Sequence, residues 1–240
     1  MKPLAFDLFC GLGGWTEGLL MEGFDVIGFD IERHVYGNLR YPSHLIIQDV
    51  TSLHGSQLRD ARLIVASPPC QTFSYMAMPW SKGKLLAADI RADQTGEKLE
   101  NLTRLFKTCF RLQGEASEAS GRHIPIVVEN VRGAQDWVGR ARWNYGSFYL
   151  WGDVPALMPT TRSYKSSGMN WCDRTRHGQC FTKVAGMQAM EGIKQGGNWW
   201  HNEGSISRLT SSKSEARRQA SAMIAKIPLP LSRHIARSFF

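Results

Sequence analysis

Strand and helix signals alternate along residues 4–66, and this alternation constrains the fold more than any other feature of the sequence. Helices are expected over 15–21 and near 33–39. Four short apolar runs between them have the length and composition of strands: 4–9, 25–30, 44–47 and 63–66. Because strands joined by helical segments form βαβ units, the sequence predicts an α/β fold with a parallel sheet and helices on both faces.

The pattern continues for roughly another ninety residues. Apolar residues at helical spacing predict a helix over 98–116, and apolar runs at 123–130 and 146–152 predict two further strands. The polar residues 81–95 lack a clear period and predict a mobile loop. Residues 1–152 are therefore expected to form one domain.

Residues 153–205 differ from this domain in composition. Glycine, serine, tryptophan and basic residues dominate there, and no long periodic run is found. This composition predicts a small loop-rich insertion rather than more sheet. Two helices are expected after it, over 214–226 and 231–239, so that 206–240 returns to complete the first domain.

The chain of 240 residues carries a formal net charge of +8. An excess of this size favours a polyanionic partner, of which nucleic acid is the commonest. Asp7 interrupts the short N-terminal apolar run, so neither a signal peptide nor a membrane span is expected there. Five cysteines at irregular spacing do not predict a disulfide framework, and Cys172, His177 and Cys180 lack the fourth ligand of a zinc site. We expect a cytoplasmic monomer that binds neither a metal nor a membrane.

Polar side chains and glycines gather where the predicted parallel strands end. The turn DLFCGLGG (7–14) joins the first strand to a helix, and its glycines let the backbone approach a ligand at the helix N-terminus. Asp30 and Asp49 end the second and third strands, where an acid can bind ribose hydroxyls or accept a proton from an adenine amino group. Either aspartate could instead cap the segment that follows it. Because ligands bind at the carboxyl edge of such sheets, the combination indicates a nucleoside cofactor.

Cys70 and Glu129 follow the fourth and fifth strands at the same edge. The prolines of SPPCQTFS (67–74) fix the backbone before Cys70, and a helix start after it would lower the pKa of the thiol. The apolar run IPIVV before Glu129 disfavours a surface position for this acid. The alternatives are a buried inert thiol and a surface carboxylate. We interpret the pair as a thiol nucleophile and a carboxyl acid that face one cleft with the cofactor.

Three motifs in this order, DLFCGLGG, SPPCQTFS and VVENVRG, resemble those of the DNA (cytosine-5) methyltransferase family. The segment IPLPLSRHIA (227–236) is similar to the last helix of that family, which packs against the cofactor site. The resemblance covers most of the chain except 153–205. It implies a Rossmann-like sheet that binds S-adenosylmethionine and releases S-adenosylhomocysteine, with double-stranded DNA as the substrate.

The resemblance also implies a reaction. Cys70 would attack the sixth carbon of a flipped-out cytosine while Glu129 binds or protonates the ring nitrogen, so that the fifth carbon accepts the methyl group. The family holds the base and the attacking loop with an RxR pair. This role is assigned to Arg140 and Arg142, with Arg174 and Arg176 as the rival pair.

Binding roles carry over by position. The residues expected to bind the cofactor are Phe9, Gly11, Leu12, Gly13, Gly14, Asp30, Ile31, Asp49, Val50 and Pro69. Those expected to bind DNA are Gln71, Ser74, Arg162, Lys165, Arg174 and Arg176, the last four within the insertion that corresponds to a target-recognition region. Where the family has a glycine–asparagine pair, this chain has IAKIP (224–228), so Lys226 is expected to make a different contact to the methionine part of the cofactor.

Two other functions remain open at this stage. One branch of the family methylates cytosine in RNA, and a chain that kept only the fold would be a non-catalytic DNA-binding module. Intact Cys70, Glu129 and glycine turn argue against the second. The absence of a regulatory extension predicts a bacterial or phage origin, as in a restriction–modification system, whereas the target sequence does not follow from these residues.

Overall fold

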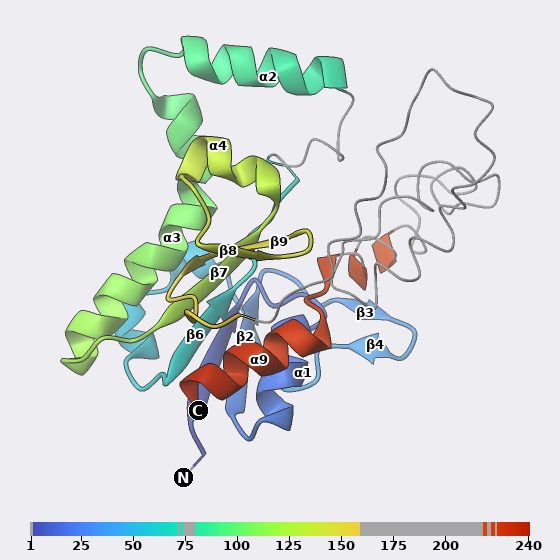
Figure 1. The fold of residues 1–240 in the computed structure, drawn as a ribbon, viewed down its shortest axis with the longest axis vertical. Coiled ribbons are helices and arrows are strands. Elements are labelled where there is room, and N and C mark those ends of the chain that lie inside the picture. Colours follow the sequence, from blue (N-terminus) through green and yellow to red (C-terminus); the bar gives the residue numbers. More distant parts are fainter. Residues whose placement is uncertain (1, 72, 74–79, 159–217, 220–221, 224) are drawn as a thin grey trace.

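The fold was obtained as a computed structural model that describes residues 2–71, 73, 80–158, 218–219, 222–223 and 225–240. A seven-stranded sheet with the order β5-β2-β1-β6-β7-β9-β8 forms its centre (Figure 1). The bounds of these strands are β1 Leu4–Leu8, β2 Asp25–Asp30, β5 His44–Ile47, β6 Leu63–Ala66, β7 Ile126–Asn130, β8 Trp143–Tyr145 and β9 Phe148–Gly152. Strands β5, β2, β1, β6 and β7 are parallel, and β9 and β8 pair antiparallel.

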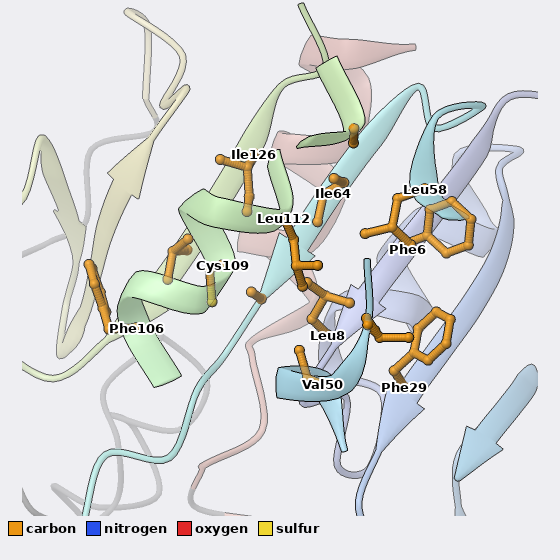
Figure 2. Packing of buried hydrophobic residues seen from close by; sticks show 14 of the residues in the cluster. Phe6, Leu8, Phe29, Val50, Leu58, Ile64, Phe106, Cys109, Leu112 and Ile126 are labelled. Atoms are coloured by element: carbon orange, nitrogen blue, oxygen red, sulfur yellow. The ribbon is translucent and has the colours of Figure 1, made fainter. Parts of the chain in front are cut away.

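Helices cover both faces of this sheet (Figure 1). The helical elements are α1 Gly14–Met21, α2 Trp80–Ala92, α3 Glu97–Ser120, α4 Gln135–Val138, α9 Leu229–Phe239 and the short 3-10 turns η1 Val50–Ser52, η2 Gly55–Leu58 and η3 Arg132–Ala134. Side chains alternate between the faces along each strand. Figure 2 shows Leu8 and Ile64 next to Leu112 of α3, with Phe6 of the same cluster beside Leu58 of η2. Ala5, Val65 and Val127 point the other way, and they pack against α1 and α9. This double burial explains why β6 reads as the uninterrupted apolar run LIVA.

The predicted α/β fold with a parallel sheet and helices on both faces is confirmed. The four strands expected before residue 67, the strand over 123–130 and the helix over 98–116 all occur with small shifts at their ends. The predicted strand over 146–152 corresponds to β9, which joins the sheet antiparallel to β7. The closing helix corresponds to α9.

The helix expected near 33–39 is wrong. The chain there forms a two-stranded hairpin of β3 Val35–Tyr36 and β4 Leu39–Arg40. Gly37 has a φ of +58°, and the two residues between the strands are Gly37 and Asn38. Residues that accept positive φ favour the two-residue turns of hairpins, and this local preference outweighs the weak helical pattern.

The mobile loop expected over 81–95 is also wrong for most of its length, because α2 occupies residues up to Ala92. Leucine, alanine, lysine and arginine are strong helix formers and are frequent in this segment. Ile90 is buried, whereas Leu85 is largely exposed, so that α2 buries only a narrow stripe. A helix with such a narrow apolar face gives little periodic signal in the sequence.

The proposed insertion and the helix expected over 214–226 fall largely outside the described residues. Residues 153–158 are described and stay attached to the α/β body, because Asp153 accepts hydrogen bonds from Ile126 N and Gln113 Nε2, both at 2.9 Å. Val154 and Met158 pack against the α1–α9 side of the core. The domain boundaries therefore stay a prediction. No helix in the described part of the chain is long and apolar enough to span a membrane.

Candidate active site

The carboxyl ends of five parallel strands bring the candidate residues to one edge of the sheet. The register pairs Leu8 with both Phe29 and Ala66, and Ala66 with Val128. Asp30 therefore lies level with the glycine turn, and Glu129 lies level with the segment that leads to Cys70. Binding sites of open parallel sheets form at this edge.

The glycine turn after β1 has an unusual backbone conformation. Gly11 and Gly13 have φ values of +50° and +75°, and Gly13 N donates to Cys10 O at 2.7 Å to close the turn. Phe9 also has a positive φ of 56°, which is costly for a residue with a Cβ and occurs most often at functional sites. A Cβ added to Gly11 would meet no atom of the described residues within 4 Å, so that this part of the turn is open. Such a turn fits a ligand that approaches the backbone closely.

Asp30 ends β2 and points at this turn. Its Oδ2 accepts a hydrogen bond from Gly11 N at 2.8 Å, and its Oδ1 lies 3.6 Å from His34 Nε2. Burial by itself raises the pKa of Asp30, but the hydrogen bonds from His34 and Gly11 N outweigh it and lower the pKa below its usual value. The side chain is therefore an anion at neutral pH, as a ribose-binding acid must be.

A buried polar cluster lies behind the turn. Thr16 Oγ1 donates to Asp7 Oδ2 at 2.7 Å and lies 2.7 Å from Tyr41 Oη. Burial raises the pKa of Asp7 to about 8 against the lowering effect of Thr16, and the charge of Asp30 adds to the rise. Burial likewise raises the pKa of the neighbouring Cys10 thiol. Asp7 is thus a neutral carboxylic acid at pH 7, and its Oδ1 has no hydrogen-bond partner in the described part of the chain.

Three other residues expected to bind the cofactor, Asp49, Val50 and Ile31, differ in their exposure to solvent. Asp49 is exposed and caps η1, where its Oδ1 accepts from Thr51 N and Thr51 Oγ1, both at 2.8 Å. These hydrogen bonds lower the pKa of Asp49. Val50 is buried in the core beside Phe29, whereas the side chain of Ile31 is 69% exposed at the edge. Asp49 and Ile31 are therefore accessible to a ligand, and Val50 only supports them from below.

The loop that carries Cys70 is tied to the sheet at its base. Asn130 Nδ2 donates to Pro68 O at 3.0 Å, and Trp15 Nε1 donates to Ser67 Oγ at 3.0 Å. Pro68 is buried, whereas Pro69 and Gln71 are exposed and Cys70 is half-buried. Phe73 N donates to Cys70 O at 3.0 Å, so the described residues after the thiol form a turn. Residue 72 and residues 74–79 lie outside the described residues, so the helix start expected after Cys70 stays a prediction.

Glu129 lies at the end of β7 and is only 3% exposed. Its strand neighbour Leu150 also accepts a hydrogen bond from Arg142 N at 2.8 Å and pairs with Trp143. Arg142 is thus about 10 Å from Glu129 across two strand spacings. The side chains of Arg140 and Arg142 are exposed, and Gly139 before them, with a φ of +91°, accepts a hydrogen bond from Trp151 Nε1. The backbone of Arg142 therefore lies two strands from Glu129 at nearly the same level of the sheet, and Arg140 lies two residues before it in the segment that leads into β8.

The C-terminal segment closes the site from the α1 side. A Cβ added to Gly14 would collide with the backbone of Ile227, so that the start of α1 and the start of the last segment are in direct contact. Lys226 Nζ donates to Glu17 Oε1 at 2.5 Å in the first turn of α1. Lys226 therefore lies next to the glycine turn, as its expected contact to the cofactor requires. Leu12, Gly13 and Gly14 are buried beneath it.

The remaining candidates lie outside the described residues: Ser74, Arg162, Lys165, Arg174 and Arg176. The same holds for Cys172, His177 and Cys180. Among the described residues, no group of three histidine, cysteine or acidic side chains could hold a metal ion.

The sequence patterns gave no role to several residues that the structure brings to the site. His34 contacts Asp30, Thr16 contacts Asp7, and Tyr41 contacts Thr16. Asn130 anchors the Cys70 loop. Asp7 was the one sequence signal of the buried polar cluster, because a carboxyl group inside an apolar strand needs a polar partner once it is buried. Thr16 is 9 positions from Asp7 along the chain, and Tyr41 is 25 positions from Thr16. Local sequence patterns therefore do not reveal these contacts.

Comparison with known proteins identifies the N-terminal part of this arrangement. Residues 5–91 match the family model described as C-5 cytosine-specific DNA methylase. The type II methylase M.HgiDII of Herpetosiphon aurantiacus is 32% identical over 84 residues, which are 31% of this chain and 23% of that protein. The type II methyltransferase M.DdeI of Desulfomicrobium norvegicum is 34% identical over 77 residues, which are 28% of this chain and 18% of that protein. The chain thus matches about a fifth of the length of these relatives. The resemblance is confirmed for DLFCGLGG and SPPCQTFS, which lie within residues 5–91, whereas VVENVRG and IPLPLSRHIA lie beyond the matched residues.

Solved structures of low similarity include further methyltransferases. A DNA modification methyltransferase encoded within an E. coli prophage is 23% identical with a TM-score of 0.36, over 55% of this chain and 33% of that one. The Dnmt2 methyltransferase of S. pombe is 16% identical with a TM-score of 0.36, over 58% of this chain and 37% of that one. The fold assignment itself depends on the sheet order and strand directions described above.

Proposed function

We propose that this chain, whose residues 5–91 match the C-5 cytosine-specific DNA methylases, transfers a methyl group from S-adenosylmethionine to carbon C5 of cytosine in double-stranded DNA. The observation that carries the proposal is the common sheet edge at which Cys70 and the buried Glu129 lie beside the glycine turn. Glu129 lies beyond the matched residues, so its position at this edge is independent support. The organisms of the two curated relatives favour a bacterial protein of a restriction–modification system.

The residues at this edge fit S-adenosylmethionine. Asp30 is an anion at the end of β2, where it would bind the ribose hydroxyls, and Asp49 is accessible at the end of β5 for the adenine. The open turn at Gly11 would receive the part of the cofactor between them and Cys70. The other residues of this site would be Phe9, Leu12, Gly13, Gly14, Ile31, Val50 and Pro69. When bound, the cofactor supplies an electrophilic methyl group on a sulfonium.

Cys70 and Glu129 divide the chemistry on the base. The Cys70 thiolate forms a bond to C6 of a cytosine that has been flipped out of the duplex, while Glu129 donates a hydrogen bond or a proton to N3. Electron density would then move to C5, where S-adenosylmethionine would supply the methyl group and leave as S-adenosylhomocysteine. Loss of the C5 proton to a base and expulsion of the thiolate restore the aromatic ring and free Cys70.

Substrate binding is assigned to the exposed groups around this edge. Arg140 and Arg142 would hold the flipped base and the Cys70 loop, with Arg174 and Arg176 as the rival pair. Gln71, Ser74 and the basic residues of 153–205 would contact the duplex. Residues 1–152 would carry catalysis and cofactor binding, and residues 153–205 would carry target recognition. Residues 206–240 would form the closing helices of the catalytic domain.

A trapped adduct tests the covalent mechanism. Duplex DNA that contains 5-fluorocytosine should give a denaturation-resistant complex with the protein in the presence of S-adenosylmethionine, because fluorine at C5 cannot leave as a proton. Cys70→Ala should form no adduct and should keep its affinity for S-adenosylhomocysteine within a few-fold. Glu129→Gln should slow turnover by about two orders of magnitude, as for other general acids.

Cys109→Ala is the matched control, because it removes a buried thiol from α3 that donates only to Leu105 O. This variant should still form the adduct. Adduct formation by Cys70→Ala would refute the mechanism, and turnover on RNA rather than on duplex DNA would redirect the substrate.

A further inference from the structure

His34 occupies a position at the cofactor site for which the proposed reaction has no use. It follows the end of β2 by four residues, and its side chain is only 20% exposed. Its Nε2 faces Asp30 Oδ1 at 3.6 Å, and its Nδ1 lies 3.4 Å from Tyr36 Oη at the start of the β3–β4 hairpin. His34 thus bridges the hairpin and the acid that is assigned to the ribose.

The two oxygens of Asp30 are not equivalent. Oδ2 is held by Gly11 N at 2.8 Å inside the turn. Within the described part of the chain, Oδ1 has only a long contact from Glu32 N at 3.4 Å and the imidazole of His34. Because Oδ2 maintains the turn, Oδ1 is the oxygen left for an incoming hydroxyl. A nucleoside and His34 would therefore compete for the same atom.

The surroundings of His34 favour its protonated form. The charged and titratable groups recorded against it are Asp30 from β2, Glu32 at 3.8 Å and Tyr36 from β3, and none of these is a cation. Behind the turn, the charge of Asp30 helps to raise the pKa values of Asp7 and Cys10, so that both are neutral at pH 7 and add no charge near His34. The hydrogen bond to Asp30 raises the pKa of His34 from its usual value of 6.5, against a smaller opposing effect of burial.

We propose that His34 is a positioning residue that pairs with the ribose-facing oxygen of Asp30 and releases a proton when a nucleoside takes its place. In the free protein the imidazolium holds the carboxylate in the orientation that Gly11 N requires. A ribose hydroxyl that donates to Oδ1 removes the partner that kept the proton on His34. Binding of the cofactor and loss of this proton are therefore linked, and affinity should increase as the pH rises.

The inference depends on the proposed cofactor, and calorimetry can separate the two. S-adenosylhomocysteine is titrated into the whole protein between about pH 6 and pH 9, in pairs of buffers that differ in ionisation enthalpy, so that protons released are counted directly. We expect fractional proton release near neutral pH, none at the alkaline end, and an affinity that increases with pH by at most about tenfold per unit, the limit for one linked proton.

His34→Gln removes the titrating group and keeps a hydrogen-bond donor. It should lose the proton release and bind at low pH as tightly as the unmodified protein does at high pH. His44→Gln, at the exposed start of β5, is the matched control and should keep the release. The amino group of the ligand ionises equally in all three proteins and cancels in the comparison.

Each outcome has a definite consequence. Unchanged affinity across the pH range in the unmodified protein overturns the inference without recourse to any variant, as does proton uptake on binding. Equal proton release in the unmodified protein and in His34→Gln assigns the proton to another group and overturns it too. If the unmodified protein binds no S-adenosylhomocysteine at any pH, the proposed function itself fails, and the role of His34 with it.

Discussion

Asp7 makes the stability of the protein depend on pH. Its carboxyl group is 1% exposed, and burial raises its pKa to about 8 from the ordinary value of 3.8. The folded state therefore binds this proton more tightly than the unfolded state does. The resulting stabilisation is fully present below about pH 4 and is lost as the pH rises toward 8, by at most about 1.4 kcal/mol per unit.

Asp7→Asn should remove this dependence, because the amide is neutral at every pH and can still accept the hydrogen bond from Thr16. Urea denaturation between pH 5 and about 8.5 should show a falling free energy of unfolding for the unmodified protein and a flatter profile for the variant. Asp25→Asn, on the exposed start of β2, should leave the slope as it is. Parallel profiles for Asp7→Asn and the unmodified protein would mean that Asp7 is ionised when folded.

The two arginine pairs can be separated by what their loss affects. Arg142 lies directly before β8, two strands from Glu129 in the sheet. A contact from Arg142 to the flipped base would therefore assist catalysis more than DNA affinity. A phosphate contact does the reverse and weakens binding about equally on all sequences. Arg142→Ala should therefore lower single-turnover methylation far more than DNA affinity, and Arg176→Ala should mainly lower affinity. Exchanged profiles would assign the base to Arg174 and Arg176.

Helices α1 and α9 pack so closely that a side chain on one glycine of α1, Gly18, would collide with α9. A Cβ on Gly18 would lie 2.6 Å from Arg233 N and 2.5 Å from Ser232 Cβ, whereas a Cβ on Gly114 of α3 would meet no atom within 4 Å. Ser232 Oγ also donates to Trp15 O at 2.5 Å, and Glu22 pairs with Arg233 and Arg237. The contact thus joins the helix after the glycine turn to the end of the chain.

Alanine at these two glycines should have opposite effects. Gly114→Ala should stabilise the protein by about 0.5–1 kcal/mol, the difference in helix propensity. Gly18→Ala should destabilise it by about 1–3 kcal/mol, because overpacking at a rigid contact outweighs that gain. Thermal denaturation of both variants measures the difference, and equal shifts would mean that α9 can move away from α1 at little cost.

Asn130 joins the end of β7, which carries Glu129, to the loop that carries Cys70. Its Nδ2 donates to Pro68 O across 62 residues of sequence, and its Oδ1 accepts from Val131 N at 2.8 Å. Asn130→Ala should leave the buried Pro68 carbonyl without this partner and cost about 1–3 kcal/mol of stability. Single-turnover methylation should fall more than cofactor affinity does, because the Cys70 loop loses its anchor. Unchanged methylation in a folded variant would show that the prolines alone position the thiol.

The sequence predicted those parts of the fold and the site that depend on local pattern. A few residues suffice to predict the strand of an apolar run such as LIVA or the glycine turn of 7–14, and both were located correctly. The hairpin at 35–40 was missed because strands of two residues contain no period, although Gly37 and Asn38 carried its turn signal. The cluster of Asp7, Thr16 and Tyr41 was missed because its contacts form only after the sheet has assembled. Local pattern therefore locates strand ends, and tertiary packing decides which side chains meet there.

The charge of the whole molecule predicts how it associates with DNA. A net charge of +8 and a basic 153–205 segment favour many phosphate contacts, each of which releases counterions from the duplex. Between about 50 and 200 mM salt, DNA affinity should therefore fall by about tenfold for every two phosphates neutralised. Affinity for S-adenosylhomocysteine should change little over the same range, because Asp30 and the glycine turn would bind it by direct hydrogen bonds in a partly buried site. Fluorescence anisotropy with a labelled duplex and calorimetry with the cofactor product measure the two responses. A DNA affinity that does not depend on salt would remove the basic segment from the interface, since the contacts of an apolar or purely base-reading surface release few ions.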